Sequence, residues 1–311
     1  RSVIKVMTFN LNKVIDKNFY PLPETERSNM RHRPIGLGVQ GLADTYVLMD
    51  YTFDSKSAMT LNKEIFENMY FAALESSNDI ATKDGPYKSW EGSPAQLGKL
   101  QFDLWNVSPI TNLPWDDLKE RIKKTGLRNS LLVAPMPTAS TSQILGNNEC
   151  IEPYTSNLYL RRTLAGEFLV VNKHLMDKLM KLGMWNEDMK NKLMYYKGSV
   201  KNIMEIPEHI RDLFKTTWEI KQKVIIDQSV DRGPYICQSQ SLNIHLENPT
   251  FNSLSSMHMY GWKKGLKTGS YYIRGKPASS IQNFTIDPQI EAKLREEMLK
   301  SQDDECEMCS A

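Results

Sequence analysis

Small hydroxyl side chains gather in one short stretch of the sequence and could bind a phosphate. An apolar run at residues 131–134 is short enough for a buried strand, and prolines lead from it into the cluster. Residues 143–145 could begin a short helix, whose unpaired N–H groups and dipole favour an anion. The candidate phosphate-binding residues are Pro137, Thr138, Ala139, Ser140, Thr141 and Ser142. A helix N-cap within a turn rich in serine and threonine explains the same spacing without any ligand.

Two adjacent tyrosines, Tyr271 and Tyr272, are candidates for redox chemistry. A phenol can lose an electron and a proton together, which a phenylalanine ring cannot do. In a strand, neighbouring side chains face opposite sides unless the backbone turns. Two aromatic rings that fill the end of a strand are the alternative interpretation, which the residues alone leave open.

A C-x-x-C pair, Cys306 and Cys309, lies in the polar segment at the end of the sequence. As a zinc site the pair supplies only two of the usual four ligands, and the nearest histidine, His258, lies far back in the sequence. We expect no bound metal. An accessible pair of this spacing is better suited to exchange with another disulfide. Cys150 and Cys237 have no partner at useful spacing, and we expect both to be buried as small apolar groups.

A glycine-rich match to the dinucleotide-binding pattern, at residues 36–41, is rejected. The pattern requires a preceding strand within a βαβ unit, but residues 24–33 are strongly polar and do not form a strand pattern. Glycines that permit tight packing between a helix and a strand are the preferred explanation.

Composition narrows the class of protein. The 311 residues carry 39 Lys and Arg against 37 Asp and Glu, a balance that indicates neither a nucleic-acid nor an acidic-membrane partner. The sequence has no apolar run long enough to span a membrane and no signal peptide, and its four cysteines are too few for a disulfide scaffold. We therefore expect a cytoplasmic protein with enough chain for one large domain or two.

Helices and strands must position these side chains, and the sequence predicts about five strands that alternate with helices. The predicted strands are residues 34–39, 131–134, 157–164, 235–246 and 271–274. The predicted helices are residues 3–15, a long helix capped by Asp54 or Ser55 and stopped at Gly85, a short helix around 118–122, and residues 172–182, 187–196, 208–231 and 251–267. Such alternation is typical of parallel βα units in an α/β fold. From Gly275 the pattern dissolves, and we expect a mobile tail.

Several longer stretches resemble one enzyme family, in that family's order along the chain. They are RHRPIGLGVQGLAD from Arg31, EGSP from Glu91, RNSLL from Arg128, PMPTASTSQILGNNE with IEPYTSN from Pro135, QSQSLNIH from Gln238, MHMYGWKKGLKTGSYYIR from Met257 and CEMC from Cys306. Together they resemble the large subunit of class I ribonucleotide reductase, of the kind found in eukaryotes and their viruses. The resemblance covers essentially the whole chain.

The resemblance also implies a fold. It implies the C-terminal half of the family's ten-stranded α/β barrel, with residues 1–285 in the barrel and residues 286–311 in a flexible tail that carries the cysteine pair. A half barrel has open strand edges, so we expect it to behave poorly alone. Because the resemblance begins midway through the family's pattern, we expect the C-terminal part of a longer polypeptide, or half of a split one.

The resemblance implies roles for the candidate residues. The family's complete enzyme reduces ribonucleoside diphosphates to deoxyribonucleoside diphosphates by radical chemistry, for DNA synthesis. Residues 137–142 would hold the substrate diphosphate, and Tyr271 and Tyr272 would be the last leg of a radical path from a metal-containing small subunit. Cys306 and Cys309 would re-reduce an active-site disulfide and then be reduced by thioredoxin or glutaredoxin. ATP, dATP and other effectors would bind outside this chain, and the full-length subunit would form a homodimer or a higher oligomer.

One departure from the family's pattern limits what this chain can do. No stretch matches the family's Asn-Leu-Cys-x-Glu loop, which carries the cysteine that forms the thiyl radical. We therefore expect the chain to be inactive by itself. Two alternatives remain. One is a non-catalytic fragment that only binds the small subunit or the missing half, and the other is an unrelated phosphosugar barrel enzyme with Glu149 and Glu152 as catalytic carboxylates.

Overall fold

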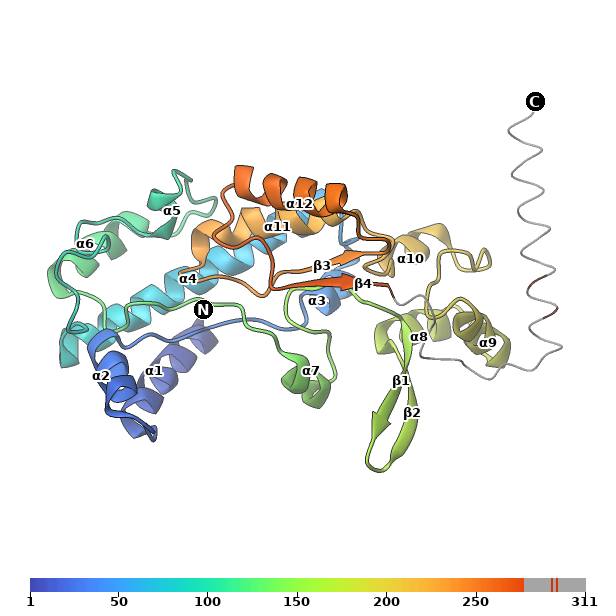
Figure 1. Ribbon diagram of the computed structural model, residues 1–311, viewed down its shortest axis with the longest axis horizontal. Coiled ribbons are helices and arrows are strands. Elements are labelled where there is room, and N and C mark those ends of the chain that lie inside the picture. The colour runs from blue at the N-terminus through green and yellow to red at the C-terminus, as the bar shows by residue number, and fades with distance from the viewer. Residues whose placement is uncertain (277–291, 293–294, 296–311) are drawn as a thin grey trace. The chain divides into compact units, whose positions relative to one another are not determined.

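A computed structural model describes residues 1–276 of the chain, together with Ala292 and Arg295 (Figure 1). The chain folds into two compact units. The first contains Arg1–Leu42, Asp54–Glu152 and Lys221–Arg274, and the second contains Ala43–Phe53 and Pro153–Ile220. The hydroxyl stretch and the tyrosine pair both belong to the first unit. Cys306, Cys309 and the domain boundary expected at residue 285 lie outside the described residues.

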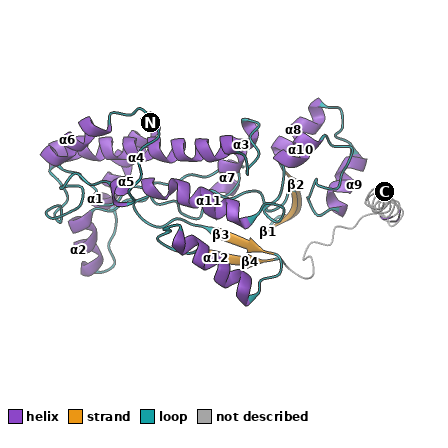
Figure 2. Cartoon of the chain, turned by 90° about the horizontal axis from the view of Figure 1, so that it is seen from above, coloured by secondary structure: helices purple, strands orange, loops and turns teal. Residues whose placement is uncertain are grey.

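A long helix, α4 (Lys56–Asp84), is the centre of the first unit. Ser55 caps this helix, because its side-chain oxygen accepts a hydrogen bond from the Ala58 amide at 3.1 Å. Gly85 ends it with a φ of 77°. The cap and the stop both agree with the prediction from the sequence. The helix packs against α1 (Ser2–Lys17), α6 (Trp115–Thr125) and α11 (Gln222–Arg232) (Figure 2).

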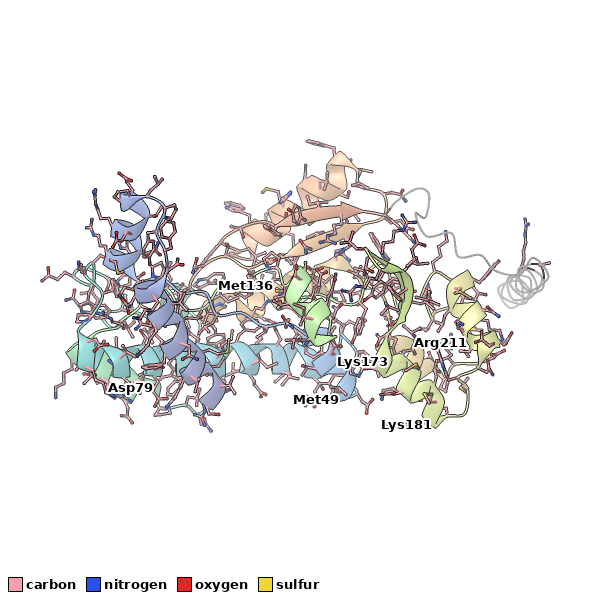
Figure 3. All side chains as sticks on the ribbon, turned by 90° about the horizontal axis from the view of Figure 1, so that it is seen from below. Met49, Asp79, Met136, Lys173, Lys181 and Arg211 are labelled. Atoms are coloured by element: carbon pink, nitrogen blue, oxygen red, sulfur yellow. The ribbon has the colours of Figure 1, made fainter. Side chains whose placement is uncertain are left out.

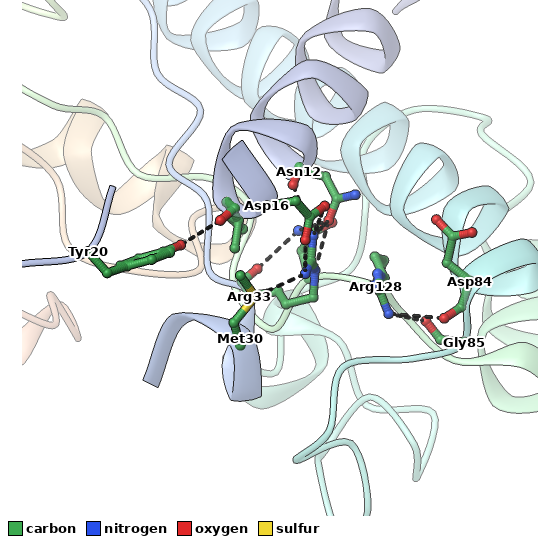
Figure 4. Close-up of polar contacts among 10 residues, drawn as sticks. Asn12, Asp16, Tyr20, Met30, Arg33, Asp84, Gly85 and Arg128 are labelled. Carbon is green, nitrogen blue, oxygen red and sulfur yellow. Dashed lines mark hydrogen bonds and ion pairs between the residues drawn. The ribbon is translucent and has the colours of Figure 1, made fainter. Parts of the chain in front are cut away.

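A buried arginine fixes the turn after α2 (Pro23–His32) against α1 (Figure 4). Arg33 has a φ of 46°, and its guanidinium donates to Asn12 Oδ1 at 3.1 and 3.0 Å. It also donates to both carboxylate oxygens of Asp16, at 2.7 and 2.8 Å. The hydrogen bond from Arg33 lowers the pKa of Asp16. These hydrogen bonds therefore fix the start of the extended segment after Arg33 against α1.

Four extended segments of the first unit lie side by side, each hydrogen-bonded to the next. They correspond to four of the five strands predicted from the sequence, although only two become regular strands, β3 (Asn243–Leu246) and β4 (Tyr272–Gly275). The linking contacts are a parallel bridge between Leu37 and Val133, the Ser241 amide on the Pro135 carbonyl at 2.9 Å, and the Tyr271 amide on the Leu242 carbonyl at 2.6 Å. Segments that are far apart in the sequence are thus neighbours in the first unit.

The last two of these segments form a βαβ unit. The strands β3 and β4 are neighbours in one sheet, α12 (Phe251–Lys263) connects them, and their arrows point the same way in Figure 1. The strand predicted over residues 235–246 is shorter than expected, because Gly233–Tyr235 form a turn of 3₁₀-helix instead. The parallel arrangement of this unit agrees with an α/β fold.

The second unit contains an antiparallel hairpin, β1 (Leu158–Thr163) and β2 (Gly166–Val171). Its pairing runs from Leu158 opposite Val171 to Thr163 opposite Gly166. The prediction of a parallel strand here is wrong, because so short a connection can join only antiparallel strands. The unit also contains α8 (Lys173–Lys181), α9 (Glu187–Tyr195) and α10 (Glu208–Leu213).

The helix predicted over residues 208–231 is in fact two helices, α10 and α11. In the segment between them, Glu219 Oε2 accepts hydrogen bonds from the Thr216 amide at 2.6 Å and from the Thr216 hydroxyl at 3.0 Å. Local side-chain contacts of this kind compete with the helical pattern. The other short helices are α3 (Leu42–Leu48) and α5 (Gln101–Leu104). Over the residues that the structure describes, no helix is long and apolar enough to cross a membrane.

Candidate functional site

The hydroxyl stretch forms a short helix, α7 (Ala139–Leu145), and is not a loop that leads into one. The prediction placed the helix start at Gln143, whereas the helix begins at Ala139 and ends at Gly146 with a φ of 66°. Ser140 and Thr141 therefore lie in the first turn, where backbone N–H groups have no acceptor within the helix. Both side chains are exposed. Met136, which is labelled in Figure 3, precedes this turn.

The remaining residues of the stretch are split between the surface and the interior. Pro137 and Ala139 are exposed, whereas Thr138 and Ser142 are buried. The Oγ1 atom of Thr138 accepts a hydrogen bond from the Cys150 amide at 2.7 Å and makes no capping bond to α7. The Ser142 hydroxyl donates to the Ala139 carbonyl at 3.3 Å. The N-cap interpretation therefore does not explain Thr138, whose hydroxyl holds the chain that returns after the helix.

A glutamine from the glycine-rich segment clamps the helix from outside. The Thr141 hydroxyl donates to Gln40 Oε1 at 2.8 Å, and Gln40 Nε2 donates to Asn147 Oδ1 at 3.0 Å. One residue further, the Gly41 amide donates to the Asn148 carbonyl at 2.9 Å. The contact between Gln40 and Asn147 could not be predicted from the sequence, since the two residues are 107 positions apart.

The glycines of this segment allow extended backbones to approach closely. A Cβ at Gly38 would lie 3.1 Å from the Cα of Pro135, and a Cβ at Gly41 would lie 3.3 Å from the Cβ of Asn147. Gly41 also has a φ of 76°. A helix, α2, precedes the segment, so the strand that a dinucleotide-binding fingerprint requires is absent there. At Gly36 and Gly38 the close packing is between two extended segments, so the prediction of helix–strand packing is wrong there.

The two tyrosines contact each other at the start of β4. Their ring centroids are 4.4 Å apart with an angle of 63° between the planes, and the side chains of Tyr271 and Tyr272 are 51 and 54% exposed. Hydrogen bonding to Tyr272 raises the pKa of Tyr271. Because the rings touch, the backbone must depart here from the alternation of a flat strand. Contact between the two rings agrees with both interpretations of this pair, so the redox role stays a prediction.

A buried carboxyl group lies between the α7 segment and the strand β3. Glu152 is 6% exposed, and its side chain accepts a hydrogen bond from Asn243 Nδ2. Burial raises the pKa of Glu152 to about 7, although Asn243 and the charge of Arg274 act in the opposite direction. Burial also lowers the pKa of His245 to about 4. Glu152 was a candidate carboxylate from the sequence, but its partners on β3 and β4 were not predicted.

The two cysteines within the described chain are buried or partly buried. Burial raises the pKa of Cys150 to about 12 and also raises the pKa of Cys237. Thiols of this kind are not activated as nucleophiles, which agrees with their predicted role as small apolar groups. The proposed redox pair, Cys306 and Cys309, lies outside the described residues.

Comparison with known proteins identifies the family. The model of the ribonucleotide reductase barrel domain matches residues 1–272. The ribonucleoside-diphosphate reductase large chain of Schizosaccharomyces pombe is 60% identical over 286 residues, which are 92% of this chain and 35% of that protein. The large subunit of Caenorhabditis elegans is 55% identical over 99% of this chain and 40% of that protein. The large subunit of variola virus is 57% identical over 92% of this chain and 37% of that protein.

A solved structure supports the same assignment. The alpha subunit of the class Id ribonucleotide reductase of Actinobacillus ureae superposes with a TM-score of 0.71 at 26% sequence identity, over 88% of this chain and 46% of that one. The fold and the candidate site thus define part of a reductase α/β barrel. The chain belongs to the family of ribonucleotide reductase large subunits, as its sequence motifs indicated. It spans between 35 and 40% of the length of the relatives named above.

Proposed function

We propose that the chain is the C-terminal portion of the large subunit of a ribonucleoside-diphosphate reductase. The complete enzyme would reduce ribonucleoside diphosphates to 2′-deoxyribonucleoside diphosphates by radical chemistry and so supply DNA synthesis. The proposal is supported by identities of 55 to 60% to proteins named as such subunits, over more than nine-tenths of this chain. The activity belongs to the full-length subunit, since the chain covers only part of each relative.

We propose that α7 holds the substrate diphosphate. Ser140 and Thr141 present exposed hydroxyls in the first turn, beside backbone N–H groups that have no intrahelical acceptor. Both kinds of donor suit a phosphate, and small side chains let it approach the backbone. Pro137, Thr138, Ala139 and Ser142 complete the stretch, with Thr138 and Ser142 fixing the backbone from inside. The Thr141 hydroxyl donates its single proton to Gln40 Oε1, so it would have to rotate away from Gln40 to donate to a phosphate.

The observation that carries the proposal is the contact between the rings of Tyr271 and Tyr272. A centroid distance of 4.4 Å permits direct electron transfer between two phenols, and the hydrogen bond between them gives the proton a path. In the full-length enzyme the radical would arrive at this pair from a second protein. We propose that this second protein is the small subunit of the reductase, whose metal centre would generate the radical.

Several parts of the proposal concern partners of the full-length protein. Cys306 and Cys309 would re-reduce an active-site disulfide and would themselves be reduced by thioredoxin or glutaredoxin. No nucleic-acid or membrane partner is proposed. ATP, dATP and other nucleotide effectors would bind outside this chain, the full-length subunit would form a homodimer or a higher oligomer, and the cytoplasm would be its location.

A pair of conservative substitutions tests the radical role. Tyr271→Phe and Tyr272→Phe preserve most of the packing but remove the hydroxyl that can lose a proton with its electron. In the full-length subunit with its small subunit, each change should abolish nearly all turnover and leave substrate binding intact. Tyr195→Phe is a matched control, because Tyr195 and Tyr196 are also adjacent and their rings are 5.0 Å apart. Normal turnover in both test variants would rule out the radical role.

The competing proposal is a non-catalytic fragment that only binds the small subunit or the remainder of the large subunit. The two proposals differ in coexpression with the segment that the longer relatives carry in addition. Restored diphosphate reduction would favour the enzyme, whereas a stable complex without any product would favour the binding fragment.

A further inference from the structure

The Glu152 carboxyl joins the α7 segment to the strand that neighbours the tyrosines. On one side, Asn148 Nδ2 donates to the Glu152 carbonyl at 2.6 Å, so the backbone of Glu152 is held by the chain that follows α7. On the other side, Asn243 Nδ2 on β3 donates to Glu152 Oε1. Both side chains are nearly inaccessible to solvent, with 6% of Glu152 and 3% of Asn243 exposed.

The next strand connects this pair to the tyrosines. The Tyr271 amide donates to the carbonyl of Leu242, the residue before Asn243, at 2.6 Å. Tyr272 and Arg274 are two residues apart on β4 and share one of its faces. The positive charge of Arg274 acts on Glu152 and also on His245 of β3. One hydrogen bond therefore links the Glu152 side chain to Asn243 on β3. A second, from the Tyr271 amide to the Leu242 carbonyl, links the residue before Asn243 to the tyrosine pair.

One polar atom of the Glu152–Asn243 pair lacks a hydrogen bond. The Oδ1 atom of Asn243 is buried and has no hydrogen-bond partner among the described residues. An ionised carboxylate can only accept, so it could not satisfy this oxygen. A neutral carboxyl group could accept from Asn243 Nδ2 and at the same time donate to Asn243 Oδ1. An acid–amide pair with two hydrogen bonds would then leave no buried polar atom of Asn243 unsatisfied.

The surrounding charges agree with a neutral carboxyl. Burial raises the pKa of Glu152 to about 7, and the charge of Glu149 on the same segment raises it further. Arg274 on β4 acts in the opposite sense, whereas His245 on β3 is uncharged near neutral pH because its pKa is lowered to about 4. The neighbouring Cys150 stays a neutral thiol, since its pKa is raised to about 12.

We propose that Glu152 is a positioning residue, whose neutral carboxyl forms two hydrogen bonds with Asn243 and holds the tyrosine pair in register with the substrate segment. The catalytic part of this inference rests on the proposed reductase function. When Glu152 loses its proton, one of the two hydrogen bonds is lost and Asn243 Oδ1 becomes unpartnered. The link between α7 and β3 then loosens, and transfer of the radical past Tyr271 and Tyr272 slows.

Steady-state kinetics of the full-length subunit with its small subunit test the positioning role. The kcat of the wild type should fall several-fold as the pH rises through about 7, with little change in the KM for the diphosphate. Glu152→Gln should remove that decline, because an amide can form the same two hydrogen bonds at every pH. Glu149→Gln is the matched control and should keep the decline, moved to a lower pH because the charge of Glu149 contributes to the raised pKa of Glu152. An unchanged pH profile in Glu152→Gln, or a loss of its activity at every pH, would overturn the proposal.

Infrared difference spectroscopy tests the pairing without reference to activity. The full-length protein should show the carbonyl band of a protonated carboxylic acid that disappears as the pH rises through about 7. The band should be missing in Glu152→Gln and present in Glu149→Gln. Absence of the band from the wild type would overturn the acid–amide pair even in an active enzyme. A wild type that shows the band but reduces no diphosphate would instead overturn the proposed function and the catalytic role, and leave the pair itself standing.

Discussion

Two regions of the first unit differ in whether their polar side chains are buried or exposed. Around α4, Glu67 is fully buried and its carboxylate is surrounded by donors. These donors are the amides of Ile110 and Thr111 at 2.9 and 3.2 Å, the Thr111 hydroxyl and the Trp115 indole at 3.1 Å. At α7 and β4, the hydroxyls of Ser140, Thr141, Tyr271 and Tyr272 are on exposed side chains. The first region satisfies its polar groups in the interior, whereas the second carries them on exposed side chains.

Glu152 differs from both regions, because it is buried like Glu67 but has few donors. One hydrogen bond from Asn243 reaches its carboxyl, whereas Glu67 accepts from three residues. Burial without enough donors favours the neutral form of a carboxyl group. The comparison teaches that burial with few donors, as at Glu152, produces a carboxyl group that can change its protonation state near neutral pH. Changes in the scaffold should therefore act on stability, and changes in the site on binding and turnover.

The largest effect on stability should come from Glu67. Replacing it with leucine leaves the amides of Ile110 and Thr111 and the Trp115 indole without an acceptor, which should cost about 3–5 kcal/mol of unfolding free energy. Glu67→Gln keeps one acceptor oxygen and should cost less. Denaturant unfolding of the full-length protein measures both changes. A loss below about 1 kcal/mol in Glu67→Leu would show that the donors find other partners and would remove the contrast between the two regions.

The second effect is a dependence of stability on pH. The pKa of Glu152 is raised from 4.5 to about 7 in the folded state, so folding retains a proton that the unfolded chain releases. The contribution is complete below about pH 4.5 and is lost as the pH rises to about 7, a change on the order of 3 kcal/mol. Unfolding measured across this range should show the decline in the wild type but not in Glu152→Gln. A gain of wild-type stability over Glu152→Gln with rising pH would contradict the assignment.

The third effect is on substrate affinity. Replacing Ser140 or Thr141 with alanine removes a hydrogen bond to a charged group, which should cost about 1.5–3 kcal/mol of diphosphate binding free energy. Stability should change little, because both side chains are exposed. Equilibrium binding of a ribonucleoside diphosphate to the full-length subunit measures the loss. Thr163→Ala removes an exposed hydroxyl from the hairpin and should leave affinity unchanged. Unaltered binding in the Ser140/Thr141 double variant would remove α7 from the site.

The smallest effect should come from the partly exposed ion pair of the scaffold. Asp16 bonds Arg33, yet the Asp16 side chain is 47% exposed and Asn12 also holds the guanidinium. Asp16→Asn should therefore cost less than about 1 kcal/mol. Since the pKa of Asp16 is lowered from 3.8, the contribution is present above that value and is lost as the pH falls below it. A loss of stability in Asp16→Asn that grows with rising pH above neutrality would show that another group is responsible.

The sequence predicted the parts of the fold that depend on local rules. The capping serine before α4, the glycine after it and the capping asparagine before α8 all have the roles expected of their residue types. The predictions from the sequence were wrong where a local contact or a short connection changed the expected helix or strand. Thr216 and Glu219 interrupt the helix predicted over residues 208–231, and a two-residue connection turns a predicted parallel strand into a hairpin.

The candidate site shows the same division. Residue type and motif single out Ser140, Thr141 and the tyrosine pair as candidates, and their roles stay predictions. The Gln40 clamp and the Asn243 partner of Glu152 were not found, since these contacts join residues 101 and 91 positions apart. Such contacts form only when the extended segments pack side by side. The spacing of residues along the sequence does not predict that packing.

The central claim is that this chain supplies part of the catalytic machinery of a ribonucleoside-diphosphate reductase. The most direct test combines the chain with the remaining part of a large subunit and with the small subunit, and measures deoxyribonucleoside diphosphate formed from a ribonucleoside diphosphate. The account predicts product from the complete assembly and none when either of the other two components is omitted. A folded, fully assembled complex that forms no deoxyribonucleoside diphosphate would contradict it.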